Sequence, residues 1–83
     1  MERVTIYGAD WCEDTRRTRE HLERLGVPYD YIDIERDEQA AKWVREQNDG
    51  KERKPTLKVD EEILSTPADE KLESALRKHG LVD

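Results

Sequence analysis

The chain has 83 residues, 34% of them hydrophobic and 43% charged, and 21 acidic against 15 basic residues give a net charge of −6. This length predicts one compact domain over residues 1–83. The negative charge argues against a nucleic-acid partner, because phosphate binding needs a concentrated basic surface.

The distribution of charged and apolar residues narrows the class of protein further. Acidic and basic residues interleave as on solvated helix faces, which argues against disorder. No apolar stretch approaches the roughly 20 residues of a membrane-spanning helix, so we expect no membrane partner. Residues 1–4 enter a strand-like run without a signal-peptide pattern, and we therefore expect a cytoplasmic protein. The single cysteine, Cys12, forms no disulfide within the chain and suits a reducing compartment.

The first third of the chain predicts a strand followed by a helix. Residues 4–7 form a β-rich run that ends at Gly8. Residues 12–25 follow a helical period, with Asp10 as the expected N-cap and Gly26 as the C-terminal stop. The predicted inner stripe of this helix consists of Thr15, Thr18, Leu22 and Leu25.

The middle of the chain predicts a strand, a helix and a hairpin. Residues 29–34 read as the second strand. Asp37 is placed to cap a helix over residues 38–47, and Trp43 is expected to be inward or half-covered on it. Residues 48–50 have turn chemistry. The inner face of this helix is predicted to consist of Ala40, Ala41 and Val44. Beyond the charged loop, residues 56–59 and 63–64 predict an antiparallel hairpin.

The last segment predicts a third helix. Thr66 is the expected N-cap, Pro67 the first helical residue, and Asp69 lies three residues after the cap. Gly80 is expected to end the helix, whose inward residues are Leu72, Ala75 and Leu76. The element order β-α-β-α-β-β-α predicts an α/β fold, with a mixed four-stranded sheet and helices on both faces.

Two residues, Cys12 and Pro55, occupy positions that are candidates for a redox site. Cys12 follows a strand and begins a helix, where unpaired N–H groups and the helix dipole stabilise a thiolate, the nucleophile of disulfide exchange. A small thiol that only packs is an equally good interpretation of that position. Pro55 begins a strand after a charged loop, and position alone favours an ordinary trans proline there.

Four segments occur in an order and spacing that match a known family. Residues 5–15 hold a strand, a loop and a helix start with Trp-Cys-Glu-Asp-Thr, and residues 29–34 form a second strand. Residues 53–59 surround a proline before a strand, and residues 64–70 lead into the last helix. The chain resembles the glutaredoxins of the thioredoxin fold, and among them the short mycoredoxin type.

The resemblance implies a thiol-disulfide oxidoreductase acting on oxidised client proteins. Cys12 would attack a mixed disulfide between a protein and a small thiol, glutathione or mycothiol, and a second small thiol would release it. No bound cofactor and no metal are expected, and a monomer suffices. A cis Lys54–Pro55 bond is implied, with Pro55 facing Cys12 and the Lys54 backbone pairing with the small thiol.

The resemblance also assigns residues to binding. Thr66, Ala68 and Asp69 would hold the carboxylate or amine end of the small thiol, and a helix N-terminus is a suitable anion site on physical grounds. Simple capping by Thr66 and Asp69 is the alternative. Trp11 is expected at the site rim, where it contacts the client or shields the thiol, unless it is a packed aromatic.

The chain departs from the dithiol pattern at Thr15, which stands in place of a second cysteine. Only a monothiol route remains, in which Thr15 either donates a hydrogen bond to the Cys12 thiolate or takes no part. A catalytically silent binding module is the alternative function. Iron–sulfur carriage is less favoured, because such carriers have Cys-Gly-Phe-Ser and one thiol per chain would require a dimer and external thiols.

The charges expected near Cys12 oppose one another. Acidic residues that disfavour a thiolate are Asp10, Glu13 and Asp14, and basic residues that favour it are Arg16, Arg17, Arg53 and Lys54. Lys54 either replaces lost thiolate stabilisation or selects an acidic partner. His21 and His79 are expected on helix surfaces without a catalytic role, and no Cys/His cluster has metal-ligand spacing.

Overall fold

A computed structural model describes residues 2–83, and it contains seven helices and strands. In chain order these are β1 (Val4–Gly8), α1 (Glu13–Leu25), β2 (Asp30–Asp33), α2 (Glu38–Gln47), β3 (Thr56–Val59), β4 (Glu62–Ser65) and α3 (Asp69–Lys78). The predicted order of elements is confirmed. Within residues 2–83, no helix combines the length and apolar character that crossing a bilayer requires.

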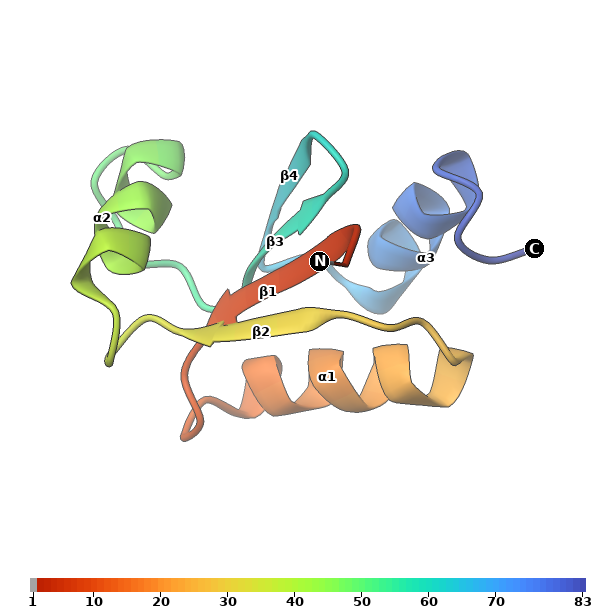
Figure 1. Cartoon of the computed structure of the whole chain (residues 1–83), viewed down its shortest axis with the longest axis horizontal. Coiled ribbons are helices and arrows are strands. Elements are labelled where there is room, and N and C mark those ends of the chain that lie inside the picture. Colours follow the sequence, from red (N-terminus) through yellow and green to blue (C-terminus); the bar gives the residue numbers. More distant parts are fainter. Residues whose placement is uncertain (1) are drawn as a thin grey trace.

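The four strands form one mixed sheet in the order β2-β1-β3-β4 (Figure 1). β1 runs parallel to β2, with Ile6 opposite Tyr31, and antiparallel to β3, with Ile6 opposite Leu57. β3 and β4 form an antiparallel hairpin. The predicted parallel pair and the predicted hairpin are both confirmed.

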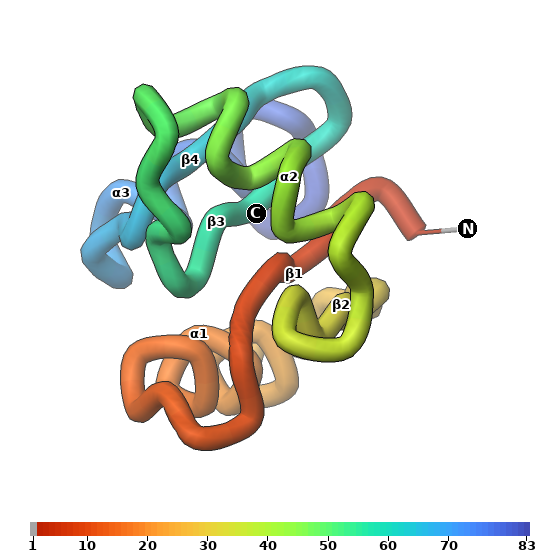
Figure 2. The backbone as a smooth tube through the Cα atoms, turned by 90° about the vertical axis from the view of Figure 1, so that its left-hand side faces the viewer, coloured from red at the N-terminus to blue at the C-terminus, as the bar shows by residue number. Residues whose placement is uncertain are grey.

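Helices cover both faces of the sheet, with α1 and α3 on one side and α2 on the other (Figure 2). Side chains alternate between the two faces of β1, so Val4 and Ile6 enter the larger core while Tyr7 faces α2. The larger core is built from Val4, Ile6, Leu22, Val27, Leu57, Val59, Leu64, Leu72, Ala75 and Leu76. The smaller core comprises Ile34, Ala40, Ala41 and Val44.

Several predicted local features of the helices are confirmed. The Asp37 side chain accepts a hydrogen bond from the Ala40 N–H at 3.0 Å and so caps α2. Gly26 ends α1 with φ 72°, the left-handed conformation that glycine adopts at low cost. Trp43 is half-covered and stacks on Tyr7, with ring centroids 4.6 Å apart. The predicted inward residues of α2 and α3 are buried.

The ends of α1 differ from the prediction. The helix begins at Glu13, and Cys12 occupies the N-cap position without a side-chain capping bond. Asp10 is therefore not the cap: it lies two residues too early, and its carboxylate accepts a hydrogen bond from Tyr31 instead. Leu25 is 37% exposed, because Val27 takes its place in the core after the chain turns at Gly26.

The start of α3 also differs from the prediction. The helix begins at Asp69 with Ala68 at the N-cap, so Thr66 is not a cap and Pro67 is not the first helical residue. Thr66 has φ 42°, and its N–H donates to the Pro55 carbonyl at 2.8 Å. Thr66 does not serve as the cap because its backbone lies in the left-handed region, whereas Ala68 has the extended backbone that an N-cap residue adopts.

The remaining corrections concern strand ends and the histidines. β2 is shorter than predicted, and β4 extends from Glu62 to Ser65. His21 is buried, with Nε2 2.9 Å from Glu73 Oε2 of α3 but not aligned for a hydrogen bond. His79 is half-buried between carboxylates of the β3–β4 hairpin. Both expectations of a surface histidine failed because α3 packs against α1 and the hairpin.

Candidate active site

Cys12 lies in the connection between β1 and α1, directly before the first residue of the helix. Its N–H donates to the Ala9 carbonyl at 3.1 Å, and its own carbonyl accepts from the Arg16 N–H at 3.1 Å. The side chain is partly exposed at the N-terminal end of α1. This position is the one predicted from the sequence, and it combines access for a reactant with the positive end of a helix dipole.

A loop from the other side of the molecule faces Cys12. The Lys54–Pro55 peptide bond is cis, as the family resemblance implied. The Lys54 carbonyl oxygen lies 3.7 Å from Cys12 Sγ, so the thiol donates a weak hydrogen bond to it. Pro55 is fully buried beside this carbonyl. The fold therefore joins Cys12 to a backbone acceptor that lies 42 residues later in the chain.

Thr15 is fully buried, and the structure gives it a packing partner. A Cβ atom built on Gly8 would lie 2.5 Å from Thr15 Oγ1 and 2.6 Å from Cγ2, so the threonine fills the space that glycine leaves open. The Thr15 hydroxyl accepts a hydrogen bond from the Ala9 N–H at 3.4 Å. Within residues 2–83 it makes no hydrogen bond to Cys12, and a catalytic part for Thr15 stays a prediction.

Trp11 forms the exposed rim beside Cys12, and 62% of its surface is accessible. Its indole Nε1 donates to Glu35 Oε2 at 2.6 Å. The ammonium of Lys54 lies 5.4 Å from the Trp11 ring centroid and 3.9 Å from Glu52 Oε1. The positive charge of Lys54 is thus directed to a carboxylate and an aromatic ring, while its carbonyl faces the thiol.

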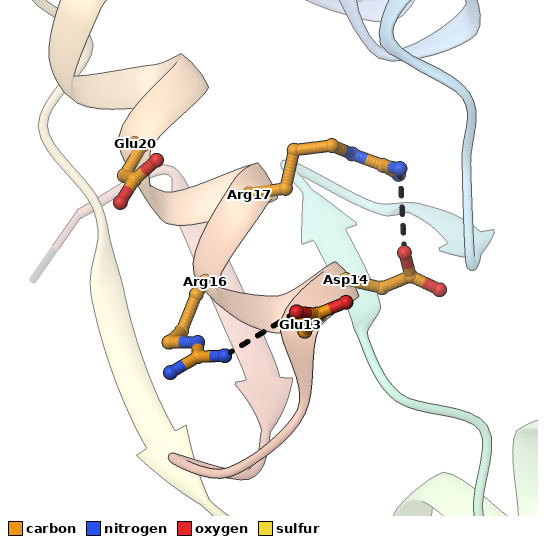
Figure 3. A pocket seen from close by; sticks show the side chains of 5 residues that line it. All are labelled: Glu13, Asp14, Arg16, Arg17 and Glu20. Carbon is orange, nitrogen blue, oxygen red and sulfur yellow. Dashed lines mark ion pairs between the residues drawn. The ribbon is translucent and has the colours of Figure 1, made fainter.

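The carboxylates around Cys12 are each balanced by a neighbour. Glu13 lies 3.9 Å from Arg16, and Asp14 lies 3.3 Å from Arg17; both pairs border a shallow depression of about 430 Å³ on α1 (Figure 3). Because each of these carboxylates has an arginine within 3.9 Å, the opposite charges of each pair offset one another at longer range. Of the charged residues predicted near Cys12, Glu13, Asp14, Arg16 and Arg17 therefore form ion pairs with one another.

The carboxylate of Asp10 interacts instead with a tyrosine of β2. The Tyr31 hydroxyl donates to Asp10 Oδ1 at 2.7 Å, and Arg19 stacks on the Tyr31 ring at 4.0 Å from its centroid. Burial and the hydrogen bond to Asp10 raise the pKa of Tyr31. The tyrosine therefore keeps its proton at neutral pH and holds the Asp10 carboxylate against β2.

The N-terminus of α3 lies close to the N-terminal part of α1. Asp69 Oδ1 is 3.8 Å from Arg17 Nε, which makes Arg17 a link between the two helices that the sequence reading did not identify. This oxygen is buried and has no hydrogen-bond partner within residues 2–83. Ala68 is exposed next to it at the N-cap, and Thr66 is exposed two residues earlier.

Three further residues near the site were not singled out from the sequence as functional. Asn48, Thr56 and Ser65 form a hydrogen-bonded cluster beneath the loop that carries Lys54. An asparagine directly after α2 and before a charged loop is the available signal, and by itself it indicates only turn chemistry. Within residues 2–83, no three His, Cys, Asp or Glu side chains are grouped to hold a metal ion.

Comparison with known sequences places this geometry in a family. The family model described as Glutaredoxin matches residues 4–64. Mycoredoxin 1 of Corynebacterium glutamicum is 41% identical over 66 residues, which cover 80% of this chain and 81% of that protein. A Mycobacterium tuberculosis protein that carries the name glutaredoxin is 33% identical over 76 residues, 90% of each chain.

Solved structures agree with the sequence matches. A crystal structure of a thioredoxin-like protein superposes with a TM-score of 0.82 at 25% identity, over 93% of this chain and 97% of that one. A glutaredoxin from Archaeoglobus fulgidus gives a TM-score of 0.76 at 27% identity, over 93% and 88%. The chain therefore belongs to the glutaredoxin family, has the thioredoxin fold and carries a glutaredoxin-like redox function.

Proposed function

We propose that this protein reduces mixed disulfides between client proteins and a small thiol by a monothiol route through Cys12. The observation that carries the proposal is the placement of the only cysteine of the chain, partly exposed at the start of α1 and 3.7 Å from the Lys54 carbonyl. A second cysteine that could close an internal disulfide does not exist in the sequence. Each reduction therefore consumes one free molecule of the small thiol, in addition to the one that the mixed disulfide already carries.

The proposed reaction has two exchange steps. The Cys12 thiolate attacks the small-thiol sulfur of the mixed disulfide, a new S–S bond forms, and the client leaves as a thiolate that takes up a proton. A second small thiol, as its thiolate, then attacks the small-thiol sulfur bound to Cys12. This releases a symmetric small-thiol disulfide and restores Cys12. The incoming small thiol is the reductant: its sulfur is oxidised to the disulfide, the sulfur carried by the mixed disulfide stays at the disulfide level, and the client sulfur returns to the thiol.

The small thiol that fits this proposal is mycothiol, with glutathione as the alternative. The support is the similarity to a relative named Mycoredoxin 1 at 41% identity. The small thiol would align its amide groups with the Lys54 backbone beside Pro55. Its polar end would lie against the free N–H groups of α3, near Thr66, Ala68 and Asp69.

Trp11 and Lys54 have separate parts in this proposal. Trp11 is the exposed aromatic beside the thiol and would contact the client protein. The Lys54 ammonium interacts with Glu52 and the Trp11 ring, so its part would be to hold the indole in place. The Lys54→Ala variant should therefore slow reaction with a folded client more than reaction with a small mixed disulfide.

The test is turnover of a mixed disulfide, assayed with mycothiol and with glutathione in parallel. The parent protein should turn over at least one substrate, and intact-mass spectrometry should show one small thiol bound per chain. Cys12→Ser should abolish both signals, while Ser74→Ala, an exposed change on α3, should leave both unchanged. Absence of turnover with either thiol would overturn the proposal and favour a catalytically silent binding module.

A further inference from the structure

A cluster of polar side chains lies at the base of the loop that leads from α2 to β3. It consists of Asn48 after the last turn of α2, Thr56 at the start of β3 and Ser65 at the end of β4. Asn48 is 7% exposed and Thr56 is fully buried, while Ser65 lies at the exposed edge of the cluster. Burying a polar side chain destabilises the folded protein unless the side chain is hydrogen-bonded. The hydrogen-bond partners of these residues therefore show which segments the cluster connects.

Asn48 is the centre of the cluster, and its side chain joins three elements. Its Nδ2 donates to the Val44 carbonyl of α2 at 2.7 Å and to Thr56 Oγ1 of β3 at 3.2 Å. Its Oδ1 accepts a short hydrogen bond from the Ser65 hydroxyl of β4. Both hydrogens of the Asn48 amide nitrogen are therefore used, and Asn48 fixes the helix end relative to the hairpin.

The cluster continues into the loop that faces Cys12. The Thr56 hydroxyl donates to the Arg53 carbonyl at 2.9 Å, one residue before Lys54. Thr66, which directly follows Ser65 in the chain, holds the other side of the loop. Its N–H donates to the Pro55 carbonyl at 2.8 Å. The Arg53 carbonyl is thus bound by a residue that Asn48 contacts, and the Pro55 carbonyl is bound by the residue next to Ser65, which Asn48 also contacts.

We infer that Asn48 is a positioning residue for the reaction, acting through Thr56 and Ser65 to hold the Lys54 carbonyl opposite Cys12. This inference rests on the proposed function, because it gives the held carbonyl a role in aligning the small thiol. Misplacement of a binding group by about 1 Å costs up to about 100-fold in rate. Loss of the Asn48 side chain frees the loop at its base without touching Cys12.

Two variants and two matched controls test the inference. Asn48→Ala removes the centre of the cluster, and Thr56→Val removes one hydroxyl while keeping its shape. Thr56→Ser keeps the hydroxyl, and Gln47→Ala changes the exposed neighbour at the end of α2. We expect Asn48→Ala and Thr56→Val to lower kcat/KM for the mixed disulfide by about 10- to 100-fold, with both controls close to the parent.

A second readout separates positioning from a general loss of structure. The rate of Cys12 alkylation by iodoacetamide depends on thiolate fraction and access, and not on the alignment of a small thiol. It should not fall in any of the four variants, because moving the Lys54 carbonyl away removes a hydrogen bond that favours the neutral thiol and therefore leaves the thiolate fraction equal or higher. Unchanged turnover in Asn48→Ala and Thr56→Val would overturn the inference, as would alkylation rates that fall in parallel with turnover.

Amide hydrogen exchange tests the inference without depending on turnover of a mixed disulfide. The Thr66 N–H, which bonds to Pro55, should exchange faster in Thr56→Val than in Thr56→Ser, while amides of β1 stay protected. If the parent protein turns over no mixed disulfide, the proposed function fails, yet this exchange pattern still decides whether the cluster holds the loop. If Asn48→Ala does not fold, Ser65→Ala replaces it, with the same expected losses.

Discussion

Replacing Gly8 with alanine should destabilise the protein, because Thr15 occupies the space that the new methyl group needs. The added Cβ would lie 2.5 Å from Thr15 Oγ1, 2.6 Å from Cγ2 and 3.1 Å from Cβ, whereas carbon atoms in proteins pack at about 3.5–4.0 Å. β1 is hydrogen-bonded on both sides, and Thr15 is fully buried. Neither partner moves without disturbing the sheet or α1.

The size of the effect follows from two opposing contributions. Overpacking a core site costs about 1–3 kcal/mol. Gly8 has no positive φ, so alanine suits its backbone and returns about 0.4–1 kcal/mol through the unfolded state. We expect Gly8→Ala to lower the free energy of unfolding by about 1–2 kcal/mol, which is roughly 5–15 °C in Tm for a domain of this size.

Urea unfolding followed by circular dichroism measures this change, and a double-mutant cycle identifies its cause. Thr15→Ala removes the two closest atoms, so Gly8→Ala should cost at least about 1 kcal/mol less in that background than in the parent. Strict additivity of the two changes, or a Gly8→Ala variant as stable as the parent, would refute the argument that these side chains compete for one space.

Three further changes test other parts of the structure. Leu76→Ala should cost about 2–5 kcal/mol in urea unfolding, because Leu76 is fully buried in the larger core. The hydrogen bond from His79 holds the pKa of Glu62 below its usual value, so its stabilisation is present above about pH 4.5 and lost as pH falls through the lowered pKa. Glu62→Gln should therefore lower Tm at pH 7 but not at pH 2.5, and an equal loss at both would contradict this. Trp11→Phe should change the unfolding free energy by less than about 1 kcal/mol, because the indole and its bond to Glu35 are exposed.

Most elements of the fold could be predicted from local sequence patterns. The inner faces of α2 and α3 follow a helical period, and the caps at Asp37 and Gly26 use residues whose chemistry suits those positions. These features depend on residues close together in the chain, so the sequence contains the information directly. The position of Cys12 at the start of α1 belongs to the same class.

The corrections fall where a local pattern competes with a distant partner. Asp10 has the chemistry of a helix cap, but Tyr31 binds its carboxylate across the sheet edge. Thr66 has the same chemistry, but its N–H is bound to the distant Pro55 carbonyl and its φ of 42° differs from the extended backbone of a cap. His21 has the spacing of an exposed residue until α3 packs over it.

The sequence by itself determined the order of the elements, most of their inner faces and the placement of the single thiol at the start of a helix, because each depends on spacing along the chain. Only the tertiary structure decided the surroundings of that thiol. Cys12 and Lys54 are 42 residues apart, and Asn48 and Ser65 are 17 apart. Hydrogen bonds of this kind form only once the sheet brings distant segments together, and no local pattern specifies which donor will reach which acceptor.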